Sequence, residues 1–391
     1  MTRPLQDITV LDFTTTIAGP HCTRLMADLG ATVIKIEAAE GDLLRSRPPL
    51  RNGASTSYGQ LNAGKQSIVL DLKRPEAREI VMRLLATTDI LVENFRPGVM
   101  KRFGLDYPNL KDKRPTLIYC AISGYGQTGP SAGLAAYAPA VHASSGFDLA
   151  HLSYQPGRDR PDNCGIYVAD YLTGTYAFGA VMTALAHRHV TGRGQAIDVT
   201  MLETMLSTLG PEVQMAQFVV EPPGRPMFGP VRTNNGYIMP AIASERSFQG
   251  LCKAAGREDW LTDPRFAIYA DRRRNWGLLI DELEIWSSTL TTTDCQATFD
   301  REGVPSSPYR TVREVMQDPQ LAHRGAFATV EDAGGSFQVL NPPFRFSEAT
   351  VGVGGYAAGL GENTRSVLDA AGYTDAEIDA LTAAGVVVAG D

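Results

Sequence analysis

The segments Ile8-Thr9-Val10-Leu11-Asp12-Phe13, Ala18-Gly19-Pro20 and Thr32-Val33-Ile34-Lys35-Ile36 decide the fold. The two outer segments are short runs of apolar and β-branched residues, a pattern typical of buried strands. Pro20 suits the start of a helix and Gly30 suits its C-terminal end, so we expect a helix at 21–29. Strand, helix and strand in this order predict a parallel α/β unit with a right-handed crossover.

The same alternation continues along the chain. We expect helices at 75–85 and 171–189, and strands at 67–72, 89–93, 116–122 and 196–200. The sequence therefore predicts an α/β fold with a parallel sheet, whose ligand site lies beyond the carboxyl ends of the strands. From 225 to about 325 the composition changes: all three Trp residues lie there, and we expect a smaller, mainly helical domain after a linker at 221–226.

Composition excludes several classes of protein. The 391 residues include 36 Lys and Arg against 43 Asp and Glu, a net charge of −7 that argues against a nucleic-acid partner. The 5 cysteines include no CxxC pair, so neither a disulfide framework nor a metal site is expected. No apolar run approaches the roughly 18 residues of a membrane span, and the first residues lack a signal-peptide pattern. We expect a cytoplasmic protein with no membrane partner.

Common cofactor and nucleophile motifs are missing from the sequence. It contains no GxGxxG fingerprint and no P-loop, which removes the main support for NAD or ATP chemistry. It also contains no GxSxG elbow of a serine hydrolase.

Asp170 is the carboxylate of greatest interest, because it stands at the start of the helix expected at 171–189. An Asp at this place can cap the helix by accepting hydrogen bonds from backbone N–H groups. The same helix end can hold the carboxylate ionised as a nucleophile toward an acyl group. The two interpretations are compatible, and the residues alone leave both open.

Six blocks of the sequence share their order and spacing with the motifs of one known family. The blocks are 5–13 with 18–20, 29–37 and 41–42, then 62–67, 92–98, 123–130, 169–171 and 188–195. Together they resemble class III CoA-transferases, the family of formyl-CoA transferase, carnitine CoA-transferase and α-methylacyl-CoA racemase.

The resemblance implies that Asp170 attacks an acyl-CoA thioester and forms a mixed anhydride. CoA thiolate then attacks the aspartyl carbonyl, and the resulting thioester passes CoA to a carboxylic acid. Such exchange conserves the energy of the thioester, so it needs CoA substrates but no ATP, NAD or metal.

The resemblance also implies positions that bind CoA, with the basic side chains near its phosphates. These positions are Lys73, Asn94, Phe95, Arg96, Arg102, Gly124, Tyr125 and Gly126.

The substrate end of the site departs from two branches of the family. Ile17 stands where formyl-CoA transferase has a catalytic Gln, Ala38 replaces its Arg, and its four-glycine loop has no counterpart. Tyr137 stands at the His base of the racemase, which disfavours epimerisation. We expect Ile17, Tyr137 and His142 to contact the substrate. The alternatives are an acyl-CoA epimerase of the same fold and a non-catalytic acyl-CoA-binding protein.

The family fold has two interlocked subunits, each with a Rossmann-like large domain and a smaller inserted α+β domain. For this chain the resemblance implies a large domain at 1–224, a small domain at 225–328, and a C-terminal part at 329–391 that returns to the large domain. It also implies a homodimer with the site at the subunit interface.

Overall fold

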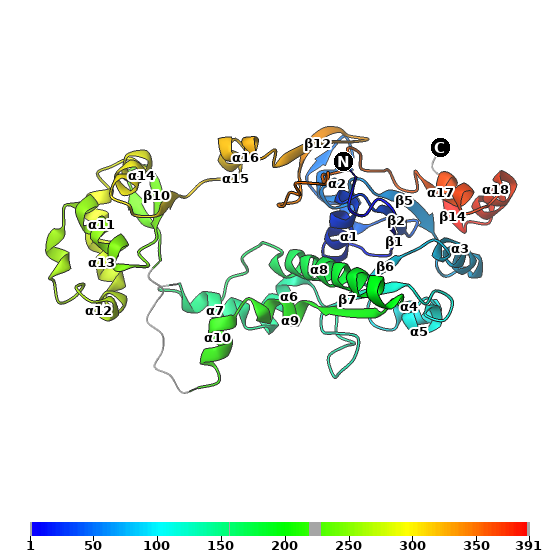
Figure 1. Cartoon of the computed structure of the whole chain (residues 1–391), viewed down its shortest axis with the longest axis horizontal. Coiled ribbons are helices and arrows are strands. Elements are labelled where there is room, and N and C mark those ends of the chain that lie inside the picture. The colour runs from blue at the N-terminus through cyan, green and yellow to red at the C-terminus, as the bar shows by residue number, and fades with distance from the viewer. Residues whose placement is uncertain (1, 156, 219–227, 389–391) are drawn as a thin grey trace. The chain divides into compact units, whose positions relative to one another are not determined.

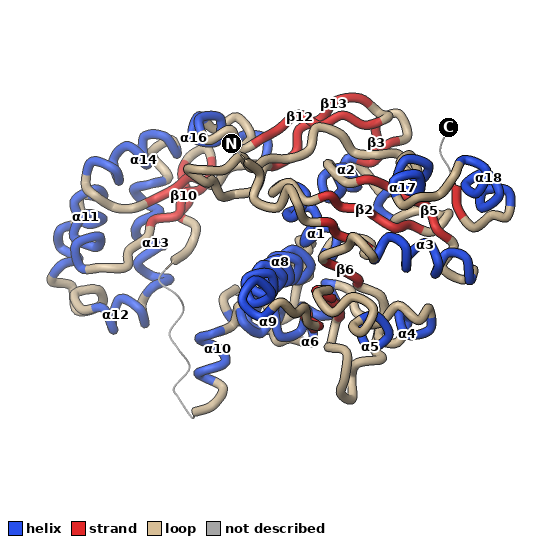
Figure 2. The backbone as a smooth tube through the Cα atoms, turned by 45° about the vertical axis from the view of Figure 1, so that its right-hand side comes forward, coloured by secondary structure: helices blue, strands red, loops and turns tan. Residues whose placement is uncertain are grey.

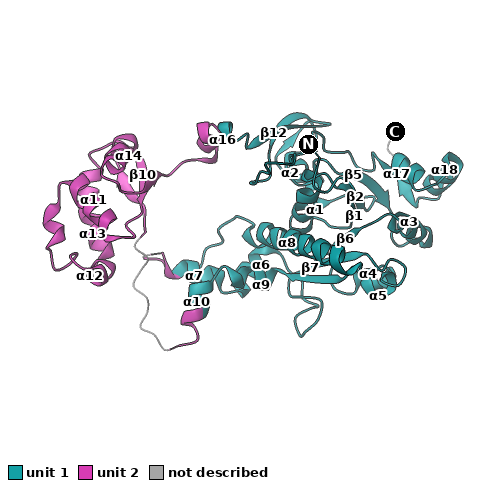
Figure 3. Ribbon diagram, viewed as in Figure 1, with its two compact units in different colours: residues 1–152, 159–213, 322–391 teal, residues 153–158, 214–321 magenta. Residues whose placement is uncertain are grey.

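The structure, a computed structural model, describes residues 2–155, 157–218 and 228–388 (Figure 1). It divides into two compact units, one of residues 1–152, 159–213 and 322–391, the other of residues 153–158 and 214–321 (Figure 3). The expected linker at 221–226 and the expected boundary at 224/225 lie outside the described residues.

A seven-stranded sheet forms the centre of the first unit (Figure 2). All its neighbouring strands run parallel except β14, which pairs antiparallel with β5. The six parallel strands, counted along the chain, lie in the order 3-2-1-4-5-6 of doubly wound α/β folds. This confirms the predicted α/β class with a mainly parallel sheet. In spatial order the strands are β14 (Val387–Val388), β5 (Gln66–Leu70), β2 (Thr32–Glu37), β1 (Thr9–Asp12), β6 (Ile90–Glu93), β7 (Ile118–Ser123) and β8 (Ala196–Thr200).

Both faces of the sheet are covered, which explains why its strands read as continuous apolar runs. On β1, Leu11 faces one hydrophobic core and its neighbour Val10 faces another. The Leu11 core includes side chains of three helices, α3 (Pro75–Leu85), α17 (Thr364–Ala370) and α18 (Asp375–Ala383). The Val10 core includes side chains of α1 (Ala18–Asp28) and α8 (Val168–Thr191).

Two helices begin three residues earlier than the sequence indicates. Helix α1 begins at Ala18 rather than at 21, and α8 begins at Val168 rather than at 171. Asp170 is therefore the third residue of α8, and the interpretation of Asp170 as the N-cap is wrong. The capping position belongs to Tyr167, whose side chain makes no capping hydrogen bond.

The second unit has its own small sheet and core. Strands β9 (Val231–Thr233), β10 (Gly236–Pro240) and β11 (Ser306–Pro308) form an antiparallel sheet in the order β11-β10-β9. Helices α11 (Glu245–Ala255), α13 (Trp276–Ser287) and α14 (Thr292–Arg301) contribute to its buried core. Trp260 is fully buried there and packs edge-on against Phe266.

Helices α1 and α8 approach each other closely at Gly174. A Cβ atom built on Gly174 would lie 2.4 Å from the Ala18 carbonyl oxygen, a distance that no packed structure tolerates. Gly179, five residues further along α8, is exposed and would meet nothing within 4 Å. The helix therefore needs glycine at the first position only.

We predict that Gly174→Ala lowers the free energy of unfolding by about 1–3 kcal/mol, because α1 and α8 must separate. Gly179→Ala on the same helix should instead be neutral or add up to about 1 kcal/mol through helix propensity. Urea denaturation followed by circular dichroism measures both. Equal effects of the two substitutions would contradict the close packing described here.

Candidate functional site

The site is built around the loop that follows β1, at the point where the strand order reverses between β1 and β6. Asn94, directly after β6, holds this loop from one side. Its Oδ1 accepts a hydrogen bond from the Thr15 N–H at 2.9 Å, and its Nδ2 donates to the Thr15 carbonyl at 2.8 Å. The expected CoA-binding residue Asn94 thus also fixes the backbone of the site.

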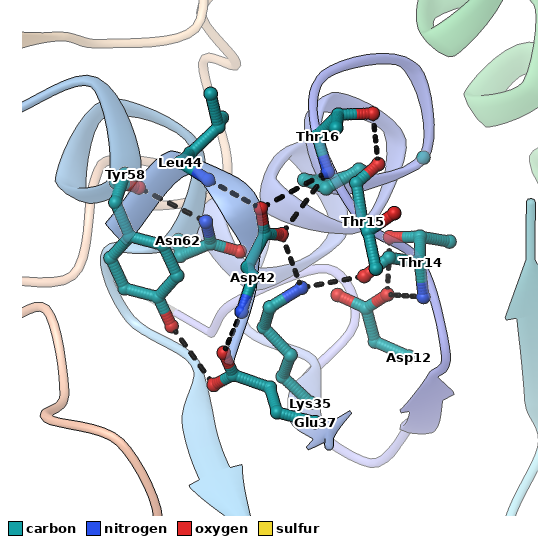
Figure 4. Close-up of polar contacts among 12 residues, drawn as sticks. Asp12, Thr14, Thr15, Thr16, Lys35, Glu37, Asp42, Leu44, Tyr58 and Asn62 are labelled. Atoms are coloured by element: carbon teal, nitrogen blue, oxygen red, sulfur yellow. Dashed lines mark hydrogen bonds and ion pairs between the residues drawn. The ribbon is translucent and has the colours of Figure 1, made fainter. Parts of the chain in front are cut away.

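A buried ion pair holds the same loop from the other side (Figure 4). The Lys35 ammonium lies 3.2 Å from the Asp42 carboxylate, and neither side chain is exposed. Lys35 also donates to the Thr14 carbonyl at 2.6 Å, while Asp42 accepts from the Thr16 N–H at 3.1 Å. These contacts keep Thr16 at a φ of 65°, a left-handed conformation that a β-branched residue rarely adopts.

A second buried ion pair, between Lys65 and Asp12, lies close to the first. Lys65 donates to the Asp12 carboxylate at 3.0 Å, and both residues are buried. Burial raises the pKa of Asp12, but the ammonium groups of Lys65 and Lys35 outweigh it and lower the pKa to about 2. Burial lowers the pKa of Lys65 to about 8 despite the neighbouring Asp12. The base of the site is therefore a fixed array of buried charges.

Asp170 meets this loop from the first turn of α8. Burial raises the pKa of its carboxyl group to about 6, although a hydrogen bond with the Ala18 backbone opposes the shift. Ala18 begins α1 immediately after the loop. The close approach of the two helices at Gly174, one turn beyond Asp170, brings this amide within reach of the carboxylate.

His142 forms a hydrogen bond with the first turn of α8. Its ring is buried, and Nε2 accepts a hydrogen bond at 3.1 Å from the N–H of Ala169, the residue before Asp170. Burial lowers the pKa of His142, against the effect of the Asp148 carboxylate, so the ring stays neutral and able to accept. His142 does not line the two cavities at Asp170 described next. The hydrogen bond from the Ala169 N–H can position the start of α8, and the expected contact of His142 with the substrate stays a prediction.

Two cavities meet at Asp170, and both are bordered by Thr16, Leu43, Tyr137 and Asp170. The smaller, of about 190 Å³, extends along the carboxyl ends of β6 and β7. Its lining includes four of the positions expected to bind CoA, which are Asn94, Phe95, Arg96 and Gly124. The larger, of about 730 Å³, has Ile17 in its wall and extends to other segments, with lining residues that include Arg47, Thr56, Ser57, Gln60, Tyr167 and Gln338.

The other expected CoA positions lie outside these two cavities. Lys73 follows β5 and Arg102 ends the short helix α4 (Val99–Arg102), and both are exposed. Both come after the carboxyl end of a strand of the same parallel sheet. Tyr125 is half-buried in the turn after β7.

The glycine-rich turn after β7 is held by contacts within the protein. A Cβ atom on Gly124 would lie 2.1 Å from the Cβ of Ala136, so this position requires glycine. The Gly126 N–H donates to the Ser123 hydroxyl at 2.9 Å, and the Gln127 N–H donates to the Asp198 carboxylate at 2.9 Å. These two amides are therefore engaged by neighbouring side chains rather than directed at a ligand.

Several residues of the site escaped sequence reasoning. Lys35 lies inside an apolar strand and gives no sign of reaching the loop after β1. Asp42 belongs to the family motif at 41–42, yet the hydrogen bond that it accepts from the Thr16 N–H depends on how β1 and β2 pair. Arg47 and Gln60 come from an irregular segment and from α2 (Thr56–Asn62), and the cationic charge of Arg47 was the one available signal.

No cluster of three or more potential metal ligands occurs among the described residues. Within the same ranges, no helix combines the length and apolarity that crossing a membrane requires.

Comparison with known proteins identifies the class of protein that this fold and site define. The sequence matches the model of CoA-transferase family III over residues 5–364. The chain belongs to this family and is a CoA-transferase, an enzyme that acts on CoA thioesters, as the sequence motifs predicted.

Individual relatives match over nearly their whole length. The chain is similar to succinyl-CoA:glutarate CoA-transferase of Homo sapiens, with 31% identity over 98% of this chain and 90% of the relative. It is also similar to succinyl-CoA–D-citramalate CoA-transferase of Chloroflexus aurantiacus, with 32% identity over 98% of each. The fold is similar to a solved structure of a CAIB/BAIF family protein from Brucella suis, with a TM-score of 0.84 and 31% identity over 95% of this chain and all of that one.

The raised pKa of Asp170 predicts that its charge destabilises the folded protein. The folded pKa of about 6 exceeds the usual 3.8, so above pH 6 the native state holds an ionised carboxylate that is more stable in the unfolded chain. Asp170→Asn removes the charge and keeps an acceptor for the Ala18 N–H. At pH 8 it should raise the free energy of unfolding by up to about 3 kcal/mol.

This gain should shrink as the pH falls through 6 and vanish below about 4, where both states of the wild type are protonated. Urea denaturation at several pH values measures it, with the exposed Asp112→Asn as the matched control. If Asp170→Asn and Asp112→Asn behave alike at pH 8, the carboxylate of Asp170 is not in the environment described here.

Proposed function

We propose that this protein moves CoA from an acyl-CoA donor to a carboxylic acid acceptor through a covalent intermediate on Asp170. The observation that carries the proposal is the position of Asp170 at the border of both cavities. One cavity is lined by residues suited to CoA, and the other is large enough for an organic acid. A carboxylate at their junction can react with a group that enters from either side.

The proposed exchange proceeds by two anhydrides and one thioester. Asp170 attacks the donor carbonyl, and CoA leaves as a thiolate, which gives a mixed anhydride. The thiolate attacks the aspartyl carbonyl, and the donor acid leaves with one oxygen from Asp170. The acceptor carboxylate then attacks the aspartyl thioester, and the released thiolate attacks the acceptor carbonyl of the second anhydride. The new acyl-CoA forms, and Asp170 regains an oxygen from the acceptor.

The environment of Asp170 supports this chemistry. A pKa of about 6 leaves the carboxylate ionised at neutral pH, while partial burial removes water that would otherwise solvate the nucleophile. An anhydride formed here is also sheltered from hydrolysis. In this proposal Arg96, Lys73 and Arg102 bind the phosphates of CoA, Phe95, Tyr125 and the glycine-rich turn line its path, and Ile17 and Tyr137 contact the acyl group.

The relatives suggest the class of acid. Those named above act on succinyl-CoA with glutarate or citramalate, according to their names. We propose that small acids with a second carboxylate are substrates here as well. We also propose that the protein acts as a homodimer in the cytoplasm, as its family resemblance suggests.

We predict that Asp170→Ala reduces CoA transfer from succinyl-CoA to glutarate by at least about 10⁴-fold, because the covalent route is lost. The control is Asp294→Ala, which removes a carboxylate from the same helical position, the third residue of α14. Mass spectrometry of the CoA products measures both. Transfer that survives Asp170→Ala would refute the proposal. Loss of the α-proton to labelled water without transfer would instead indicate an epimerase, and binding without either reaction a non-catalytic protein.

The rate of transfer should also depend on pH in a defined way. Only the ionised carboxylate of Asp170 attacks, so kcat/KM should fall as the pH drops through about 6, with a tenfold loss per pH unit below that. Measurement of kcat/KM between pH 4.5 and 8 tests this. A rate that stays constant down to pH 4.5 would show that no group with this pKa carries the reaction.

A further inference from the structure

The larger cavity at Asp170 carries one positive charge. Among the described residues that line it, two are charged, Asp170 and Arg47. The remaining polar residues of the wall are neutral hydroxyl and amide groups, including Thr56, Ser57, Gln60 and Gln338. If Asp170 is occupied with the reacting acyl group, Arg47 is left facing whatever else the substrate carries.

Arg47 differs from its neighbours in having no acidic partner. Arg45 binds Glu37, with Nη2 and Oε1 2.6 Å apart, and Arg51 binds Asp332, with Nη2 and Oδ1 2.9 Å apart. Within the described part of the chain, the Arg47 guanidinium makes no hydrogen bond or ion pair. The full set of donors of a guanidinium is thus available to a ligand in this cavity.

The backbone at Arg47 is nevertheless held in place. Its carbonyl oxygen accepts a hydrogen bond from the Ser55 hydroxyl at 2.6 Å, and its N–H donates to the Leu44 carbonyl at the end of a short 3₁₀ helix, η1 (Leu43–Ser46). Leu43 and Leu44 of this helix line the same cavity. At the start of η1, Asp42 accepts from the Leu44 N–H and is the side chain that fixes the loop beside Asp170. The segment 42–47 therefore fixes the loop beside Asp170 through Asp42 and also positions the backbone of Arg47.

We propose that Arg47 is a specificity-determining residue that binds the second carboxylate of a dicarboxylic substrate, while the first carboxylate reacts at Asp170. A planar guanidinium can bind a carboxylate through two parallel hydrogen bonds, which fixes the orientation of the acid as well as its charge. Because the wall around Arg47 is otherwise neutral, this single cation supplies the charge selectivity. This role of Arg47 rests on the proposed CoA transfer, because Arg47 would determine which carboxylic acids serve as substrates of that reaction.

The test compares two acids of equal carbon number, glutarate and pentanoate, as acceptors of CoA from a saturating acyl-CoA donor. For Arg47→Gln we expect the KM for glutarate to rise by about 10- to 100-fold, the effect of losing one charge-assisted contact. The kcat/KM for pentanoate should change by less than about threefold. Arg47→Lys, which keeps the charge but not the fork, should fall between the wild type and Arg47→Gln.

Arg96→Gln is the matched contrast, because Arg96 is an exposed arginine of the smaller cavity. It should raise the KM of the acyl-CoA and leave the preference for glutarate over pentanoate unchanged. A preference that survives Arg47→Gln, or that Arg96→Gln abolishes equally, would overturn the assignment.

A binding measurement separates this inference from the proposed function. In the Asp170→Asn background, where covalent chemistry is blocked, glutarate should raise the midpoint of thermal unfolding more than pentanoate, and the further substitution Arg47→Gln should remove the difference. If the wild type transfers CoA to no acid while this difference is found, the proposed function fails and the carboxylate site stands. Transfer without any such difference would refute the role of Arg47 alone.

Discussion

The buried ion pair between Lys35 and Asp42 is the interaction on which the site depends. Both side chains come from the segment that forms β2 and follows it, and both bind the backbone of the loop after β1. Breaking such a pair by removing one partner leaves an uncompensated buried charge, which typically destabilises a protein by about 3–5 kcal/mol. The pair fixes the loop after β1, and this loop leads directly into α1. It therefore also fixes the position of the Ala18 amide, which forms a hydrogen bond with Asp170.

The same region contains several features that are unfavourable for folding alone. Thr16 adopts a left-handed backbone conformation, and burial raises the pKa of the Asp170 carboxyl group well above its usual value. Gly174 removes a side chain so that α8 can touch α1. Thr16 and Asp170 line both cavities, and the close contact at Gly174 holds the start of α1 beside Asp170. Local unfavourable choices of this kind are expected where structure serves chemistry.

Much of the fold could be predicted from the sequence because its strands are apolar and β-branched on both faces. The helix at 75–85 and the strand at 196–200 have the expected bounds, since Pro75 marks the start of the helix and glycine precedes the strand. The start of α8 was missed because it depends on a tertiary contact, the hydrogen bond from Ala169 to His142. No residue near 168 signals that contact.

For the site, too, residues in sequence motifs could be predicted, whereas residues whose position depends on tertiary contacts could not. Family motifs pointed to Asp170 in α8 and to the residues directly after β6, and the structure places them beside the same cavity. They did not identify Arg47, which belongs to an irregular segment whose path is set by hydrogen bonds from Ser55 and Leu44 rather than by a repeating pattern. The motif containing Asp42 was visible, but its purpose emerges only when the carboxylate is seen to bind the Thr16 amide.

The central claim is that the acyl group and CoA pass through the carboxylate of Asp170, and oxygen labelling tests it most directly. The enzyme is allowed to turn over with an acceptor acid that carries ¹⁸O in its carboxylate, and the peptide containing Asp170 is then analysed by mass spectrometry. We expect one ¹⁸O atom in the side chain of Asp170 after a single turnover and up to two after repeated turnovers, delivered when the thiolate attacks the acceptor carbonyl of the second anhydride. Continued transfer of CoA with no ¹⁸O in Asp170 would contradict the claim.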